Sequence, residues 1–353
     1  MKVWHLVFRE DALTYTVAKA LTCGGHEVFV WSVDREYENR APSNLQQRLA
    51  SASDVQVIPG DTSRLPEEIG HLVVQVFPRP WQCLQDFVLL AKRAVKITLI
   101  TAGDRSKSQR QALKQQWFEA RHLGRYFGKV DRVIYKDGFY PHDLYRVFKD
   151  RSVLGFDVHS QFLHSQDAFR AIHARDWSPE EPRPILVSFL GSQDPDSRKE
   201  ILDSVRDLFL RRHPCGAVAS TEKQMFWHEY SDADQAPLGP SEFLDVLAGS
   251  DFSLCPPGYS LVTHRPIEAL LRGSIPVLPA DHFDLYAVGL EDGVNCIGVQ
   301  AQNWREAIQR VATMPENVIV ELRKNIFSMF AERLCYEAVA NAIRSRLGVA
   351  QSG

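Results

Sequence analysis

Short apolar runs alternate with longer amphipathic stretches along most of this 353-residue chain. Near its start, residues 2–8 (KVWHLVF) predict a buried strand, residues 12–22 predict a helix, and residues 27–31 (EVFVW) predict the next strand. Strands that alternate with helices form a parallel sheet covered on both faces, because a parallel crossover needs a dozen or more residues. The chain is therefore expected to have an α/β fold.

The same alternation continues to the last residues and is interrupted once. Between Arg175 and Pro184 the segment RDWSPEEPRP is rich in proline and charge, which is typical of an exposed connector between domains. The pattern predicts two Rossmann-like domains that face each other across a cleft, with C-terminal helices. Further strands are expected at 55–58, 71–77, 96–101, 131–135, 153–156, 184–190, 216–220, 251–255 and 274–278, and further helices at 81–94, 106–127, 141–149, 197–211, 241–249, 263–272, 302–313 and 317–347.

Composition narrows the function classes only slightly. The formal net charge is −3 and lysine and arginine are spread along the chain, which argues against nucleic acid as a partner. None of the six cysteines forms a C-x-x-C pair, so a zinc site is not indicated and a reducing, cytoplasmic location is expected. We expect no signal peptide and no transmembrane segment, since no window approaches the roughly 18 consecutive apolar residues of a spanning helix.

The segment 251–279, DFSLCPPGYSLVTHRPIEALLRGSIPVLP, is the most informative part of the sequence. A buried strand is predicted to end at Cys255, and the prolines after it stiffen a turn. Gly258 removes a side chain at a point where another group approaches the backbone. Pro266 is tolerated only in the first turn of a helix, so the following helix begins close to it. Its amino end then points out of the carboxyl edge of the sheet, where phosphate groups bind.

Two charged residues project from that helix. Arg265 lies in its first turn and Glu268 three residues later, so both are expected on one side of it. A planar guanidinium suits a diphosphate, and a carboxylate can accept hydrogen bonds from both ribose hydroxyls. The alternative is a surface ion pair worth well under about 1 kcal/mol. The strand–PPG–helix context favours the binding role.

The segment CPPGYSLVTHRPIEALLRGSIPVLP resembles the nucleotide-sugar motif of exostosin-like glycosyltransferases, which have a Cys-Pro-x-Gly turn, an Arg-x-x-Glu-Ala-Leu helix and Gly-x-Ile-Pro-Val. The resemblance extends upstream to PILVSFLGSQDPDSRKEIL and covers residues 184–286. Over the first 180 residues the chain resembles only the general GT-B pattern. The resemblance implies a GT-B fold with an N-terminal acceptor domain at 1–178 and a nucleotide-sugar-binding domain at 184–320. A C-terminal helix at 321–353 is expected to pack back on the first domain.

The family resemblance also implies the chemistry and the residues of the site. It implies an inverting transferase that moves a sugar from a nucleotide diphosphate sugar, most often a UDP-sugar, to a hydroxyl of a glycan or small acceptor. Arg198 and Arg265 would bind the diphosphate, Glu268 the ribose, and Gly191 would let the donor approach closely. The other donor-pocket residues expected are Pro257, Gly258, Tyr259, Ser260 and Thr263.

No metal is expected, because Arg198, Arg265 and a helix amino terminus would stabilise the leaving diphosphate. The strings Asp194-Pro195-Asp196 and Asp232-Ala233-Asp234 resemble the manganese sites of another transferase fold, but they lie in predicted loops and are read as solvated turns.

An inverting reaction also needs a general base near the acceptor hydroxyl. Asp11, after the first predicted strand, and Asp104, in TAGDRS, are the candidates, with Asp11 slightly favoured. Each could instead cap the helix that follows it. Glu10, Asp137 and Asp143 lie on comparable loops.

Two other functions stay open at this point. A fucosyltransferase-like enzyme that uses a GDP-sugar shares the GT-B design, although its Thr-Glu-Lys string is replaced here by Thr263-His264-Arg265. A degenerate transferase could bind nucleotide or glycan without catalysis. An NAD-dependent oxidoreductase is disfavoured because no G-x-G-x-x-G string follows a strand. The acceptor could be lipid-linked, and the amphipathic last helix leaves peripheral membrane contact open.

Overall fold

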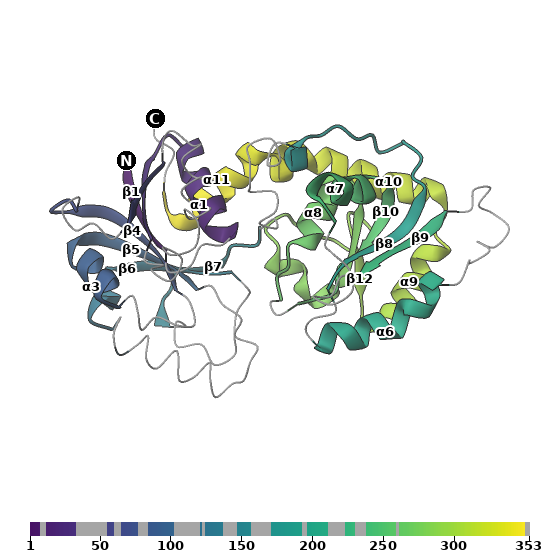
Figure 1. The fold of residues 1–353 in the computed structure, drawn as a ribbon, viewed down its shortest axis with the longest axis horizontal. Helices are drawn as coiled ribbons and strands as arrows, with labels where there is room; N and C mark the ends of the chain where they lie inside the picture. Colours follow the sequence, from purple (N-terminus) through teal and green to yellow (C-terminus); the bar gives the residue numbers. More distant parts are fainter. Residues whose placement is uncertain are drawn as a thin grey trace. The chain divides into compact units, whose positions relative to one another are not determined.

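The computed structural model describes thirteen segments of the chain, which divide between two compact units. The first unit consists of Met1–Gln166 together with Tyr336–Gly353, and the second of Asp167–Cys335. Each unit contains one parallel sheet with helices (Figure 1), which confirms the α/β prediction. The described segments are residues 1–7, 12–32, 55–59, 65–76, 84–101, 121, 124–136, 147–156, 171–192, 196–210, 223–229, 238–258 and 261–349.

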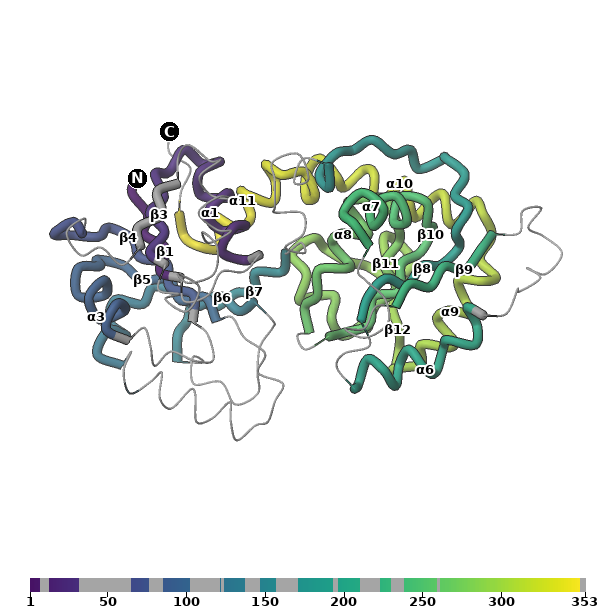
Figure 2. Tube along the Cα trace, in the orientation of Figure 1, coloured from purple at the N-terminus to yellow at the C-terminus, as the bar shows by residue number. Residues whose placement is uncertain are grey.

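The first unit is built on a seven-stranded sheet in the order β3-β2-β1-β4-β5-β6-β7, whose neighbours pair in parallel. Aromatic side chains fill the core on one face, where the rings of Trp4 and Phe29 stack at 4.9 Å and Trp31 lies beside them. The path of these strands can be followed in Figure 2. The elements are β1 (Lys2–Val7), α1 (Ala12–Cys23), β2 (Glu27–Ser32), β3 (Val55–Pro59), β4 (Ile69–Val76), α3 (Leu84–Arg93), β5 (Ala94–Thr101), η4 (Gly124–Lys129), β6 (Val130–Tyr135) and β7 (Arg151–Val153).

The last helix, α11 (Tyr336–Leu347), returns to the first unit and packs against α1. Its carboxyl end is held by cations from the sheet: Arg132 Nη1 donates to the carbonyl of Ser345 at 3.1 Å, and Lys96 Nζ donates to that of Gly348 at 3.4 Å. The last carbonyls of a helix lack partners within it and carry a partial negative charge, so basic groups stabilise this end.

Gly348 makes this contact possible. Its φ is +67°, and a Cβ atom there would lie 2.6 Å from the guanidinium carbon of Arg132. We expect Gly348→Ala to lower the free energy of unfolding by about 1–3 kcal/mol, through left-handed strain and a displaced cap. Urea unfolding measures the change, with Gly128→Ala as control, because no atom lies within 4 Å of a Cβ built there. Equal stability of the two variants would contradict this account.

The second unit contains a five-stranded parallel sheet in the order β12-β11-β10-β8-β9. Helices α6 and α9 contact each other on one face, and α7 and α8 contact each other on the opposite face (Figure 1). Its elements are β8 (Ile185–Gly191), α6 (Asp196–Leu210), β9 (Gln224–Glu229), α7 (Pro240–Ala248), β10 (Ser250–Leu254), α8 (Arg265–Leu271), β11 (Ile275–Pro279), η7 (Ala280–Leu285), β12 (Ile297–Val299), α9 (Trp304–Ala312), α10 (Glu316–Met329) and the π-helix η8 (Phe330–Leu334).

The proline-rich connector is anchored to the second unit by two buried side chains. Trp177 covers Gly273, and its Nε1 donates to the carbonyl of Leu271 at 3.0 Å. Arg183 Nη1 donates to the carbonyl of Ser250 at 2.6 Å. The division between the units therefore falls before the connector, at residues 166 and 167, whereas the sequence places the boundary between 178 and 184.

The described elements β9, β12 and the last helix differ from the sequence-based expectation. The strand expected at 216–220 lies outside the described residues, and β9 at Gln224–Glu229 was not expected. The short strand β12 was also missed. The helix expected at 317–347 is divided, because the π-helix η8 closes with a bond of 2.7 Å from Cys335 N to the Phe330 carbonyl and Cys335 is extended. In the described residues no helix has the length and apolarity to cross a membrane.

Candidate functional site

The candidate site lies at the carboxyl edge of the second sheet, where β8 and β10 end side by side. Strand β8 comes first in this unit, β9 pairs on one side of it and β10 on the other. The connections that leave β8 and β10 therefore run in opposite directions. Ligands of open α/β sheets bind at such a switch point.

Arg198, on the first turn of α6, joins the two strand ends. Its Nε donates to the carbonyl of Pro257 at 2.9 Å, and its Nη1 donates to that of Ser192 at 3.4 Å. A Cβ atom on Gly258 would lie 2.5 Å from Nη2 of this arginine. Gly258 leaves room for the close approach of Arg198, whose guanidinium is held between the carbonyls that follow β8 and β10.

Arg265, the first residue of α8, approaches the same place from the other side. Its Nη2 would lie 2.6 Å from a Cβ atom on Gly191, and its guanidinium carbon is 5.4 Å from the centre of the Phe189 ring. Within the described part of the chain, no hydrogen bond or ion pair to this guanidinium is found. Its planar set of donors is therefore available to an anion at the end of β8.

Glu268 lies one turn further into α8 and is buried, with 2% of its surface exposed. It shares its surroundings with both arginines, because the charges of Arg265, Glu268 and Arg198 all act on the Cys255 thiol. Burial is the main cause that raises the pKa of Cys255 to about 12, so the thiol stays protonated and packs as a small apolar group. All three charged side chains therefore lie near Cys255, the residue that follows β10.

Tyr286 holds the chain that leads into α8. Its hydroxyl accepts a hydrogen bond of 2.9 Å from the Thr263 amide and donates one of 3.3 Å to the Thr263 carbonyl. This contact satisfies an amide just before α8, a helix of only seven residues. The sequence did not indicate Tyr286 or the Phe189 ring beside Arg265 as site residues. No local pattern marks either residue, because each acts through a contact distant in sequence.

The structure brings together Gly191, Arg198, Pro257, Gly258, Thr263, Arg265 and Glu268. Other predicted residues lie outside the described ones: the donor-pocket residues Tyr259 and Ser260, and both candidate bases, Asp11 and Asp104. Of the acidic strings, only Asp196, the first residue of α6, is described. Among described residues, no three His, Cys, Asp or Glu side chains gather as a metal site.

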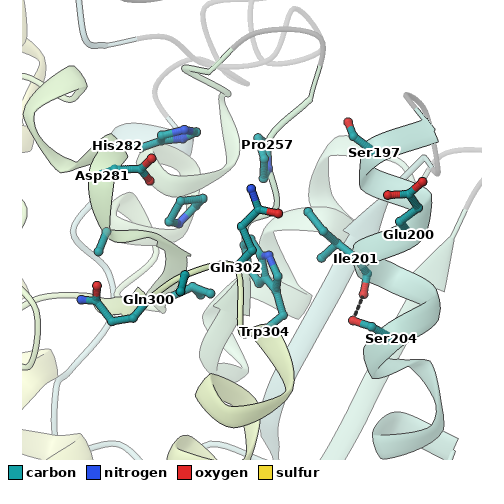
Figure 3. Close-up of a pocket in the computed structure, with 14 residues that line it drawn as sticks. Ser197, Glu200, Ile201, Ser204, Pro257, Asp281, His282, Gln300, Gln302 and Trp304 are labelled. Carbon is teal, nitrogen blue, oxygen red and sulfur yellow. Dashed lines mark hydrogen bonds between the residues drawn. The ribbon is translucent and has the colours of Figure 1, made fainter.

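A cavity of about 590 Å³ lies on the α6 side of the sheet (Figure 3). It lies over the carboxyl ends of β11 and β12, between α6, η7 and the start of α9. Pro257 belongs to both places, since its carbonyl binds Arg198 and the residue lines the cavity. The other lining residues are Ser197, Glu200, Ile201, Ser204, Pro279, Ala280, Asp281, His282, Val299, Gln300, Ala301, Gln302 and Trp304.

Comparison with known proteins gives one family match. Residues 113–287 match the family model of the Exostosin GT47 domain, a span that contains every residue of the arginine site. No curated protein sequence matches the chain.

Solved structures match nearly the whole chain at low identity. A TarM variant from S. aureus in complex with fondaparinux, alpha-GlcNAc-glycerol and UDP is 9% identical, with 98% of this chain and 99% of that chain covered and a TM-score of 0.58. HepE from Anabaena in complex with UDP and glucose is 11% identical, with 99% of each chain covered and a TM-score of 0.51. Sucrose-phosphate synthase from Thermosynechococcus elongatus is 13% identical, with 97% of this chain and 96% of that chain covered and a TM-score of 0.54. The chain is therefore exostosin-like over residues 113–287 and has the GT-B fold of glycosyltransferases.

Proposed function

We propose that this protein is an inverting glycosyltransferase that moves a sugar from a UDP-sugar to a hydroxyl of a glycan or small acceptor. Glycosyltransferase function itself is supported by the exostosin match and by the fold. The observation that carries the proposal is the arginine pair: Arg198 is fixed across the end of β10, and the Arg265 guanidinium is available beside Gly191.

The geometry suits a departing nucleoside diphosphate. Two guanidinium groups at one sheet edge can share the charge that develops on the diphosphate as the glycosidic bond breaks, and fixed groups need no reorganisation during the reaction. Glu268 would accept hydrogen bonds from the ribose, and Tyr259 and Ser260 would complete the donor pocket. Asp11, or alternatively Asp104, would take the proton of the acceptor hydroxyl in an inverting displacement.

The nucleotide is the part of the proposal that is easiest to test. UDP is favoured because the TarM and HepE structures contain it, whereas a GDP-sugar or a non-catalytic binding role would leave the same arginines in place. We expect UDP to raise the melting temperature more than GDP does, since a ligand that binds only the folded state stabilises it according to its occupancy. Differential scanning fluorimetry measures both shifts.

Arg265→Met should remove most of the UDP shift in this assay. Arg310→Met is the matched control, because Arg310 on α9 is paired with Asp292 at 3.2 Å and does not line the cavity. A larger shift with GDP would favour the fucosyltransferase-like alternative. A UDP shift without sugar transfer or donor hydrolysis, across a panel of UDP-sugars, would favour the non-catalytic one.

We also propose that the reaction needs no metal ion, because the arginine pair can supply the charge that a divalent cation supplies elsewhere. Activity should therefore persist when EDTA is added at a concentration far above that of the enzyme. Loss of turnover that manganese restores would contradict this part of the proposal while leaving the arginine site intact.

A further inference from the structure

The cavity that Pro257 lines has no role in the chemistry described above. Polar side chains surround it from three elements, with Ser197 and Glu200 on α6, Asp281 on η7, and Gln300 and Gln302 on the turn before α9. Figure 3 shows the Gln302 side chain extending toward Pro257, opposite the residues of α6. Its volume of about 590 Å³ is in the range of small-molecule sites.

The charged residues of the described lining are all acidic and exposed, so they disfavour an anion to an extent that depends on salt. Two carboxylates, Glu200 and Asp281, face the cavity, and among its described lining residues there is no lysine or arginine. Burial lowers the pKa of His282, so this imidazole is uncharged at neutral pH. A phosphate or carboxylate ligand would therefore meet repulsion without a counter-charge. The two amides can donate and accept hydrogen bonds and the two carboxylates can accept them. Together they suit an uncharged ligand with many hydroxyl groups.

The turn that carries both glutamines is strained. Ala301 and Gln302 have φ values of 47° and 60°, in the left-handed region that non-glycine residues rarely adopt. Hydrogen bonds of 2.9 Å from Asn303 N to the Gln300 carbonyl, and from Trp304 N to the Gln302 carbonyl, hold the turn. Strain of this kind concentrates at ligand sites, because a relaxed turn would move the binding groups.

We propose that this cavity binds one uncharged pyranose unit of a substrate. The inference rests on the proposed function, because it takes Arg198 to be part of the diphosphate site. Pro257 lines the cavity and binds Arg198, so a sugar in the cavity would lie next to that site. The same chemistry could come from the sugar of the donor or from the acceptor, and the kinetic experiment below separates them.

Saturation-transfer NMR with methyl glucoside and methyl glucuronide as probes tests the site without nucleotide. Methyl glucoside should bind the wild-type protein and methyl glucuronide should bind more weakly. Gln302→Gly removes the amide while accommodating the left-handed backbone, so the fold is kept and glucoside binding should weaken about fivefold. Ala301→Gly is the matched control, because glycine adopts the same left-handed backbone and no polar group is removed, so its binding should equal that of the wild type.

A second pair of variants tests the charge argument. Glu200→Gln combined with Asp281→Asn should reduce the preference for glucoside over glucuronide, which a purely structural role of these residues would not do. In kinetics, Gln302→Gly raises KM for the donor if the donor sugar occupies the cavity, and KM for the acceptor if the acceptor does, while Kd for UDP is unchanged.

Equal glucoside binding by wild type and Gln302→Gly, with neither KM altered, would overturn the inference. The proposed function would survive that result if Arg265→Met still abolished UDP binding. It would fail separately if Arg265→Met left UDP binding unchanged.

Discussion

Arg198→Met lowers kcat for sugar transfer by about 100- to 1,000-fold, in the range found when one preorganised charge-stabilising group is removed from an active site. Donor affinity falls much less. The reason lies in how Arg198 is held: carbonyls of Ser192 and Pro257 fix its guanidinium before substrate arrives. Such a group interacts more strongly with the charge of the leaving diphosphate in the transition state than with the intact donor.

The matched control is Lys199→Met, which removes an exposed positive charge from the neighbouring position on α6. Its kcat should equal that of the wild type, so a general loss of positive potential cannot explain the effect of Arg198→Met. Steady-state kinetics with single-turnover measurements separate chemistry from donor binding. Equal fold losses in kcat and in donor affinity would show that Arg198 binds donor and transition state alike.

Arg198→Lys separates charge from geometry. Lysine keeps the positive charge, but its ammonium is a single compact donor group that lacks the fork that reaches two carbonyls. If fixed geometry matters, this variant recovers only part of the lost kcat. Full recovery would assign the effect to charge alone.

Much of the second unit could be predicted from sequence because its signals are local. A buried strand that ends at Cys255, a Pro-Pro-Gly turn and a proline-started helix place Arg265 and Glu268 at one sheet edge, and the structure has them there. The prediction that Gly258 admits an approaching group was also local. The sequence could not identify Arg198 as that group, because the contact spans about sixty residues.

The parts that were missed depend on long-range contacts or on short elements. No sequence pattern around Tyr286 predicts its hydrogen bond to Thr263. Strand β12 is three residues long, which is too short for a clear strand pattern. The division of the last helix at Cys335 has no proline or glycine to mark it, since a π-helix and one extended residue produce it. The general base stays a prediction, because Asp11 and Asp104 lie outside the described residues.

The first unit should lose stability steeply as the pH falls from 6.5 to 4. His5 is buried at the centre of β1, and burial lowers its pKa from 6.5 to about 3, with the Gln75 side chain opposing this in part. Burial likewise lowers the pKa of His71 on β4 to about 4, although its Nε2 lies 2.9 Å from Thr98 Oγ1. Both rings are therefore neutral in the folded protein over most of this range, and His71 begins to bind a proton only near pH 4.

Below about pH 6.5 the unfolded chain binds protons at these histidines, whereas the folded protein does not. Each decrease of one pH unit therefore favours the unfolded state. The stabilisation is present above pH 6.5 and is lost as the pH falls toward the folded pKa values. At about 1.4 kcal/mol for each pH unit, the loss by pH 4 is about 3 kcal/mol for each histidine. Carboxyl groups begin to titrate below about pH 5, and the hydrogen bond from Lys96, which lowers the pKa of Asp131, adds to the loss there. The part of the window between pH 6.5 and about 5 therefore reports on the histidines.

Hydrogen exchange followed by mass spectrometry resolves the effect by unit, because peptides from β1 and β4 report on the first sheet and peptides from β8 and β10 on the second. Protection of β1 and β4 should fall between pH 6.5 and 4 after correction for the intrinsic exchange rate. His71→Gln can keep a side-chain hydrogen bond to Thr98 but does not titrate, so it should show about half of the wild-type pH dependence. Stability of the first unit that stays constant or rises toward pH 4 would show that these rings are protonated in the folded state and that the buried layer around β1 and β4 admits water.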